Sequence, residues 1–197
     1  MRSLTALLLL GLSGCGGTPK QQVIPEFPLK AMRSPHARGV KLYVSPQGMV
    51  DKVAVAVARE ALPDWTFALA DAQLGAGTDI EFEIEQYANG DEIYEITRLV
   101  EGKPKEIAIR GTDRKVVYFE DKGLDVGDLP EAVRTALDTP PGGLEVMGIQ
   151  HQRRADGTDR YTIKGRRQGV PVSVTFSAKG QKLSERHVLP GDLALDR

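Results

Sequence analysis

Residues 88–116 read ANGDEIYEITRLVEGKPKEIAIRGTDRKV, and residues 155–183 read ADGTDRYTIKGRRQGVPVSVTFSAKGQKL. At a constant offset of 67 the second stretch repeats residues of the first, namely Ala88, Gly90, Tyr94, Ile96, Gly102, Pro104 and Lys115. Self-similarity at a fixed spacing indicates that one supersecondary unit is used twice. These two stretches therefore decide the fold that the sequence predicts.

Each copy has the pattern of an antiparallel meander. Asn-Gly at residues 89–90 and Asp-Gly at residues 156–157 tolerate the positive φ angles of a tight hairpin turn. Between the turns, apolar and polar residues alternate, which is typical of strands with one buried face. A short last strand is expected at residues 115–119 in the first copy and at residues 182–187 in the second.

A helix is expected before each meander. Residues 50–61 and 129–137 carry apolar residues at helical spacing, and Pro130 suits a first helical turn. The two helices match at an offset of 80, which predicts 13 extra residues in the first copy, around LGAGTDIEFEIEQY. Leu-Pro at residues 62–63 also matches Leu-Pro at 129–130 at offset 67. That match would break the first helix and is set aside.

This order of helix, turn, Y-x-I, G-x-P and alternating strand resembles the PepSY-like, or beta-lactamase-inhibitor-like, domain of exported bacterial proteins. The resemblance implies an α+β fold of two tandem repeats, each a helix packed on a four-stranded antiparallel sheet. The repeats would occupy residues 48–122 and 123–190, and residues 191–197 would form a tail. It also implies binding rather than catalysis, since PepSY modules are associated with inhibition or regulation of peptidases and bring no catalytic residues.

The amino terminus has the layout of an export signal. A basic residue precedes an apolar run at residues 4–12, and small residues follow it. Cys15 is the only cysteine, and Leu-Ser-Gly-Cys at residues 12–15 resembles the lipobox of bacterial lipoproteins. We therefore expect residues 1–14 to be a lipoprotein signal peptide and Cys15 to carry the lipid. The alternative is an ordinary signal peptide with an incidental cysteine near its cleavage point.

The segment after the cysteine, residues 15–47, is rich in proline and is expected to be a lipid-anchored linker. Within it, the alternation of Val40, Leu42 and Val44 permits an added edge strand. Gly16 stands where an aspartate would favour retention at the inner membrane. The outer membrane, facing the periplasm, is therefore the expected location in a host that has one.

No motif indicates catalysis, a metal or a cofactor. His36, His151 and His187 lack metal-ligand spacing, and HQRR at residues 151–154 is expected to be a solvated strand end. The net charge of −1 gives no reason to expect nucleic-acid binding. DIEFEIE at residues 79–85 predicts a half-buried strand whose acidic face is in water. The sequence therefore predicts no catalytic residues, no metal and no cofactor.

Charge is unevenly distributed. Residues 79–121 contain 12 acidic and 6 basic side chains, whereas residues 144–188 contain 4 acidic and 9 basic ones. Drift on solvated faces would explain this difference. Alternatively, the two copies attract each other or recognise one partner that carries a charge gradient. A basic patch for partner binding is predicted at Arg153, Arg154, Lys164, Arg166 and Arg167.

These observations favour a membrane-tethered envelope lipoprotein that acts as a non-catalytic protein-binding module. Its partner would be an envelope protein, and it could inhibit or regulate an envelope enzyme such as a peptidase. A structural envelope lipoprotein that binds cell-wall material or anionic lipid is the alternative. An envelope hydrolase would need two carboxylates that folding brings together.

Overall fold

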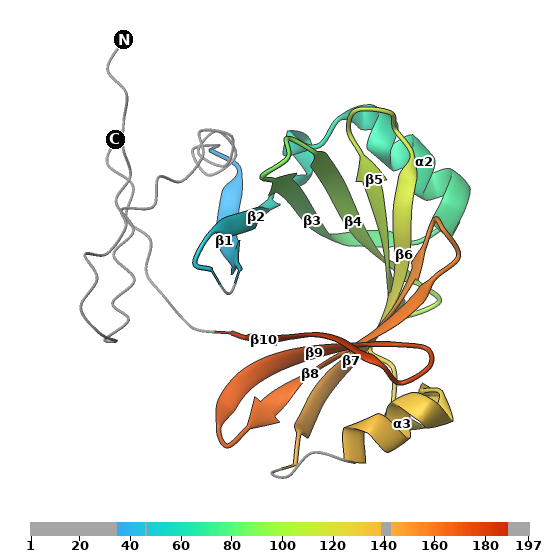
Figure 1. Cartoon of the computed structure of the whole chain (residues 1–197). Coiled ribbons are helices and arrows are strands. Elements are labelled where there is room, and N and C mark those ends of the chain that lie inside the picture. Colours follow the sequence, from blue (N-terminus) through green and yellow to red (C-terminus); the bar gives the residue numbers. More distant parts are fainter. Residues whose placement is uncertain (1–34, 46, 139–142, 189–197) are drawn as a thin grey trace, which may run out of the picture.

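The computed structural model describes residues 35–45, 47–138 and 143–188. They form one ten-stranded antiparallel sheet in which the strands lie side by side in chain order (Figure 1). The strands are β1 (Ala37–Val44), β2 (Val50–Val57), β3 (Thr78–Tyr87), β4 (Glu92–Val100), β5 (Lys103–Arg110), β6 (Val116–Lys122), β7 (Glu145–Arg154), β8 (Asp159–Arg167), β9 (Val170–Ser177) and β10 (Lys182–His187).

Two short α-helices pack on the sheet, α2 (Asp64–Leu74) and α3 (Glu131–Asp138). Single 3-10 turns, Arg59–Ala61 and Val126–Asp128, come shortly before them. None of the helices in the described part of the chain is long and apolar enough to span a bilayer. Residues 1–34, and with them Cys15 and the predicted signal peptide, lie outside the described residues.

The predicted fold class is wrong. The chain is mostly β, and it does not form two tandem repeats that each pack a helix on a separate four-stranded sheet. The two sets of strands join because β6 hydrogen-bonds to β7 over five residue pairs, from Tyr118↔Arg154 to Lys122↔Gln150. Two further strands, β1 and β2, extend the sheet beyond β3. Pairing removes the exposed edges that separate sheets would have at β6 and β7.

The helix predicted over residues 50–61 is also wrong, because most of this segment is β2. Its apolar residues fit a helical spacing, but Val53, Val55 and Val57 also alternate with period two. All three are buried, and β-branched side chains favour strands over helices. The alternation of Val40, Leu42 and Val44 does form a strand, β1, which pairs with β2.

The Leu-Pro pairs that match at an offset of 67 mark the true helix starts. Leu62 and Pro63 precede α2, and Leu129 and Pro130 precede α3, and both leucines are buried in apolar cores. The starts of α2, β3, β4 and β5 lie at residues 64, 78, 92 and 103, and those of α3, β7, β8 and β9 at 131, 145, 159 and 170. The offset is therefore 67 throughout. The 13 extra residues do not exist, because the stretch that suggested them contains β3.

The predicted hairpin turns are confirmed. Gly90 has φ 90° between β3 and β4, and Gly157 has φ 80° between β7 and β8. The second predicted helix is confirmed as α3. Pro130 lies at its start, and Val133, on the side of the helix that faces the sheet, is fully buried. Turn chemistry is local, which explains why the sequence predicts it well.

The face that α2 and α3 cover is called the outer face. It holds two apolar cores, one beneath α2 around Ile96, Ile107 and Ile109 and one beneath α3 around Ile149 and Ile163. Because side chains alternate along each strand, every second residue lies on the opposite face, called the inner face. The sheet bends around the inner face, so that β10 lies near β1 and β2 in Figure 1.

Candidate functional site

The inner face is lined by charged and hydroxyl-bearing side chains. Its bend brings the first and last strands together, since the Arg186 guanidinium carbon lies 5.1 Å from the centre of the Tyr43 ring. Strand register places the following charged and tyrosine side chains on this face: Lys41, Tyr43, Lys52, Glu81, Glu83, Glu85, Tyr87, Glu95, Glu106, Arg110, Tyr118, Glu120, Lys122, Glu145, Arg154, Arg160, Lys164, Arg166 and Arg186.

Carboxylates occupy the middle of the inner face in neighbouring strands. Glu83 lies directly opposite Glu95, and Glu106 lies directly opposite Glu120. Like charges in such positions destabilise a sheet unless other groups compensate them. Glu85, Glu95 and Glu106 are nevertheless buried, with 3%, 5% and 7% of their surfaces exposed. The sequence pattern predicted water on the acidic face of residues 79–85, and this is wrong for Glu85.

Lysine and tyrosine side chains compensate the first part of this carboxylate row. The Nζ of Lys41 donates to Glu83 at 2.6 Å, and the Nζ of Lys52 donates to Glu85. The hydroxyl of Tyr87 also donates to Glu85, at 2.8 Å. Hydrogen bonds to ionised groups are about twice as strong as neutral ones, so these contacts offset part of the cost of burial.

A second network continues the row across β4, β5 and β6. Lys122 lies 2.7 Å from a carboxylate oxygen of Glu106, and its Nζ also donates to the hydroxyl of Thr97 at 2.9 Å. The Thr97 hydroxyl donates to Glu106 at 3.0 Å. The Tyr118 hydroxyl donates to Glu95 and lies 3.4 Å from Glu106. One lysine, one threonine and one tyrosine thus connect two buried carboxyl groups.

Two carboxyl groups of the row have raised pKa values. Burial, followed by the charge of Glu106, raises the pKa of Glu95 well above its usual range. The same two causes raise the pKa of Glu120 to about 7, although Lys122 and Lys164 act in the opposite direction. The inner face can therefore take up protons in a range where exposed carboxylates are ionised.

Oxygen atoms of Glu83, Glu85 and Glu95 lie within 4.8 Å of one another. Three carboxylates at this spacing have the donor chemistry of a divalent-cation site. Lys41 and Lys52 already supply positive charge to two of them, however, so a cation would compete with two ammonium groups. Sequence reasoning missed this cluster. The sequence shows that Glu83 and Glu85 are two residues apart and so lie on the same face of a strand. It does not show the pairing of β3 with β4 that brings Glu95 beside them.

The structure divides the predicted basic patch between both faces of the sheet. Arg154, Lys164 and Arg166 are on the inner face, where Lys164 pairs with Ser173 across the strands. Arg153 and Arg167 are on the outer face. The five residues are therefore not brought together as one surface.

On the inner face the remaining cations give the sheet a gradient of charge. Acidic residues concentrate on β3 to β6, and Arg154, Arg160, Lys164 and Arg186 follow on β7, β8 and β10. Burial lowers the pKa of Lys164, and the nearby charge of Glu120 acts in the opposite direction. Lys164 and Glu120 thus lie where the acidic and basic parts of the inner face meet.

HQRR at residues 151–154 forms the end of strand β7, as predicted, but the side chain of His151 is half-buried and not solvated. Its ring stacks on Tyr161, with ring centres 4.6 Å apart and planes 6° apart, and its Nε2 lies 2.8 Å from Asp159. These three residues lie on the outer face of β7 and β8. His187 is exposed at the end of β10.

Two solved structures of Bacteroides proteins share this fold. A protein of Bacteroides eggerthii that is described as periplasmic matches with 16% identity and a TM-score of 0.51, over 64% of this chain and 88% of that chain. A DUF2874 family protein of Bacteroides uniformis matches with 14% identity and a TM-score of 0.50, over 64% and 89%. At these identities the similarity shows the fold alone.

A BLIP-like protein of Bacteroides fragilis has 21% identity over 66% of this chain and 90% of that chain, and its TM-score of 0.46 is below the level at which a common fold can be argued. No family model and no curated protein matches the sequence.

Proposed function

We propose that this chain is a non-catalytic protein-binding module of the bacterial envelope that holds a protein partner on the inner face of its sheet. In this proposal Cys15 carries the lipid and tethers the module to a membrane, with the outer membrane as its location. The partner is an envelope protein, and an envelope enzyme such as a peptidase would be inhibited or regulated by the contact.

The gradient of charge across the inner face carries this proposal. Acidic side chains on β3 to β6 and basic side chains on β7, β8 and β10 share one concave surface, which complements a partner segment of opposite polarity. Complementary potentials guide encounter and fix the orientation of a partner more than they add affinity. The fold shared with a protein described as periplasmic supports the envelope location.

The bonding of the carboxylates supports a role without catalysis. Glu106 is held by Lys122 and Thr97, and Glu85 by Lys52 and Tyr87. A general acid or base must reach a substrate proton, and these groups are engaged with one another. The hydrolase alternative would require a substrate to displace lysines from this row.

Site-specific crosslinking tests the proposal. A photoreactive amino acid at Thr175, on the inner face of β9, is expected to capture one dominant envelope protein when the full chain is expressed in a bacterial host. Lys164→Glu should reduce the capture strongly, because it reverses the charge where the two parts of the inner face meet. Rising salt should have the same effect, since it screens exposed charges.

The matched control carries the photoreactive amino acid at Arg153, which is exposed on the outer face. Equal capture from both faces, or capture that neither salt nor Lys164→Glu reduces, would contradict the proposal. Capture of only cell-wall or lipid material from Thr175 would instead support the structural alternative. Labelling with a radioactive fatty acid, lost in Cys15→Ser, tests the tether separately.

A further inference from the structure

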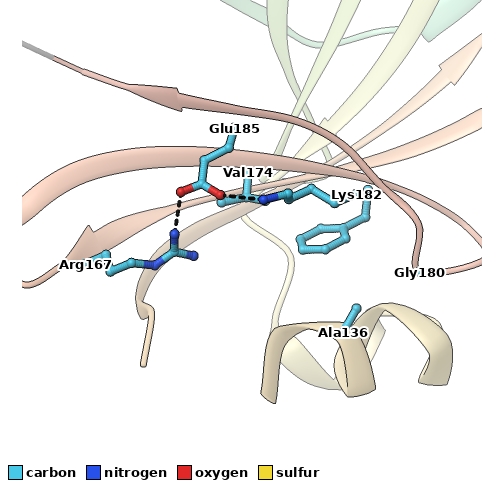
Figure 2. Close-up of a pocket in the computed structure, with 7 residues that line it drawn as sticks. Ala136, Arg167, Val174, Gly180, Lys182 and Glu185 are labelled. Carbon is cyan, nitrogen blue, oxygen red and sulfur yellow. Dashed lines mark hydrogen bonds and ion pairs between the residues drawn. The ribbon is translucent and has the colours of Figure 1, made fainter. Parts of the chain in front are cut away.

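The described residues cover the second half of the outer face incompletely. Helix α3 has 8 residues, and it packs on an apolar surface to which three strands, β7, β8 and β9, contribute. Beside Ala136 of this helix, a cavity of about 390 Å³ remains between α3 and strands β9 and β10 (Figure 2). This volume falls in the range of small-molecule sites.

One wall of the cavity is apolar. Val174 and Phe176 lie on the outer face of β9, which α3 covers, and the side chain of Ala136 points from the helix toward the strands (Figure 2). Val174 and Phe176 are otherwise buried in the core beneath α3. Gly180, in the turn between β9 and β10, closes one end, because a Cβ atom there would lie 2.3 Å from the carbonyl oxygen of Ala132.

The opposite side of the cavity is charged. Glu185 of β10 accepts hydrogen bonds from Nη1 of Arg167 and from Nζ of Lys182, the latter at 3.0 Å (Figure 2). Two cations thus share one carboxylate, which leaves a net charge of about +1 at ordinary pH. Side-chain exposure is 26% for Arg167 and 58% for Lys182, so the arginine lies deeper than the lysine.

The Arg167 guanidinium has an unused donor. Its Nε–H is buried and donates to no acceptor among the described residues, while Nη1 is engaged by Glu185. A guanidinium prefers to bind carboxylates through two parallel N–H donors. A buried donor without an acceptor is costly, and a small shift of the side chain that turned this N–H toward a bound carboxylate would remove that cost.

We propose that the cavity between α3 and strands β9 and β10 is a binding site for a small amphiphilic carboxylate, whose anionic end contacts Arg167 and Lys182 and whose apolar part lies against Val174 and Phe176. This site is on the outer face and is independent of partner binding on the inner face. A free fatty acid of medium length and the carboxy-terminal residue of a peptide with an apolar side chain both have this chemistry.

Titration calorimetry of the full chain with octanoate and with N-acetyl-leucine tests the proposal and separates the two sources. At least one of these carboxylates is expected to bind saturably, and its uncharged counterpart, octan-1-ol or N-acetyl-leucinamide, to bind at least about tenfold more weakly, as expected for the loss of a charge-assisted hydrogen bond. Methyl signals of Ala136 and Val174 in NMR spectra should shift during the titration, which locates the ligand.

Three variants complete the experiment. Arg167→Lys keeps the charge but removes the Nε donor, and it should weaken carboxylate binding roughly tenfold. Ala136→Phe fills the apolar end and should abolish binding. Arg166→Lys makes the same substitution at the neighbouring position on the inner face and should leave binding unchanged.

Failure of both carboxylates to bind would overturn the proposal. So would equal binding of the uncharged counterparts, or binding that neither Arg167→Lys nor Ala136→Phe affects. Thermal melts of the variants identify any that fail to fold, and the two variants change different walls of the cavity. Since crosslinking from Thr175 concerns the other face, its outcome and this one can be told apart.

Discussion

The burial of Glu85, Glu95 and Glu106 could not be predicted from the strand that carries each residue. In the sequence Glu85 belongs to a stretch in which acidic residues alternate with apolar ones, a pattern that usually indicates a solvent-exposed face. Their burial depends on Lys52, Tyr118 and Lys122, which come from other strands and bind them. A pattern within one strand cannot show which side chains another strand places above it.

Glu120 gives a pH dependence at the residue scale. Its pKa is raised from an ordinary value of 4.5 to about 7, first by burial and then by Glu106, so the folded state binds this proton more tightly than the unfolded chain. The free energy of unfolding should therefore fall as pH rises from about 4.5 through about 7, on the order of 1–3 kcal/mol. Glu120→Gln should remove much of this fall, measured by urea denaturation at pH 5 and pH 8.

The control for this prediction is Glu101→Gln, which removes the same charge at an exposed turn position. It should leave the pH dependence as it is in the parent chain. In Glu120→Gln the new amide oxygen can still accept the hydrogen bond that Gln150 donates to Glu120 at 2.6 Å, so a loss of packing is not expected. A parent-like pH dependence in Glu120→Gln would show that Glu120 does not titrate in this range.

The predicted basic patch failed to come together for a similar reason. Arg166 and Arg167 are neighbours in sequence but lie on opposite faces of β8, because side chains alternate along a strand. The sequence placed these residues on adjacent strands correctly. The face on which a residue lies also depends on bulges, because an extra residue shifts the alternation of side chains. One such irregularity lies between Val146 and Gly148 in β7.

At the scale of elements, the sequence prediction was wrong for residues 50–61, which were expected to form the first helix and mostly form β2. The apolar residues of 50–61 fit helical spacing, and pairing with β1 and β3 decides in favour of a strand. A short amphipathic segment is open to both conformations until its partners are known. The confirmed features, such as the turns at Gly90 and Gly157, are those whose conformation rests on local chemistry.

Helix α2 is tied to the sheet through Arg98. This residue is 3% exposed, and its guanidinium contacts Asp79 at 2.6 Å, Asp71 at 2.8 Å and the carbonyl oxygen of Gly75 at 2.7 Å. Arg98→Met should lower the free energy of unfolding by about 3–5 kcal/mol, since it leaves a largely buried Asp79 without its partner. Asp71→Asn, at a side chain that is 70% exposed, should cost less than about 1 kcal/mol.

Both values can be measured by chemical denaturation at pH 7. Equal effects of the two substitutions would mean that the contact with Asp79 contributes no more than the exposed contact with Asp71.

Helix α3 lies close to the turn between β9 and β10 at Gly180. This glycine has φ +76° and no room for a Cβ atom, whereas Gly157 has φ +80° and open space around it. Gly157→Ala should cost about 1–2 kcal/mol from backbone strain alone. Gly180→Ala should cost about 1–3 kcal/mol more, because the turn must move away from Ala132. Thermal melts of both variants check the difference, and equal costs would argue against the close approach.

At the scale of the whole molecule, hydrogen bonds between β6 and β7 join two separate apolar cores into one sheet. We expect the two cores to unfold together. Trp65, the only tryptophan, lies beside the core beneath α2 and reports on that half of the chain. Ile163→Ala in the other core should lower stability by about 2–5 kcal/mol. The Trp65 fluorescence transition should shift by the same amount.

The control is Ile107→Ala, which perturbs the core that Trp65 itself contacts. It should shift the fluorescence transition whether or not the two halves are coupled. A fluorescence transition that Ile163→Ala leaves in place, while circular dichroism shows a second and earlier transition, would mean that the halves unfold independently.

The sequence predicted the strands and turns of the second half well but not the single sheet, because joining two sheets depends on one pairing between distant segments. The order of strands in that sheet has a further consequence. Each strand pairs with the next strand along the chain, so nearly all backbone pairing is between neighbours in sequence. Such a topology has a low contact order for an all-β protein, and loop closure costs little at each step. The chain can therefore fold progressively, hairpin by hairpin, while later segments are still emerging from the ribosome.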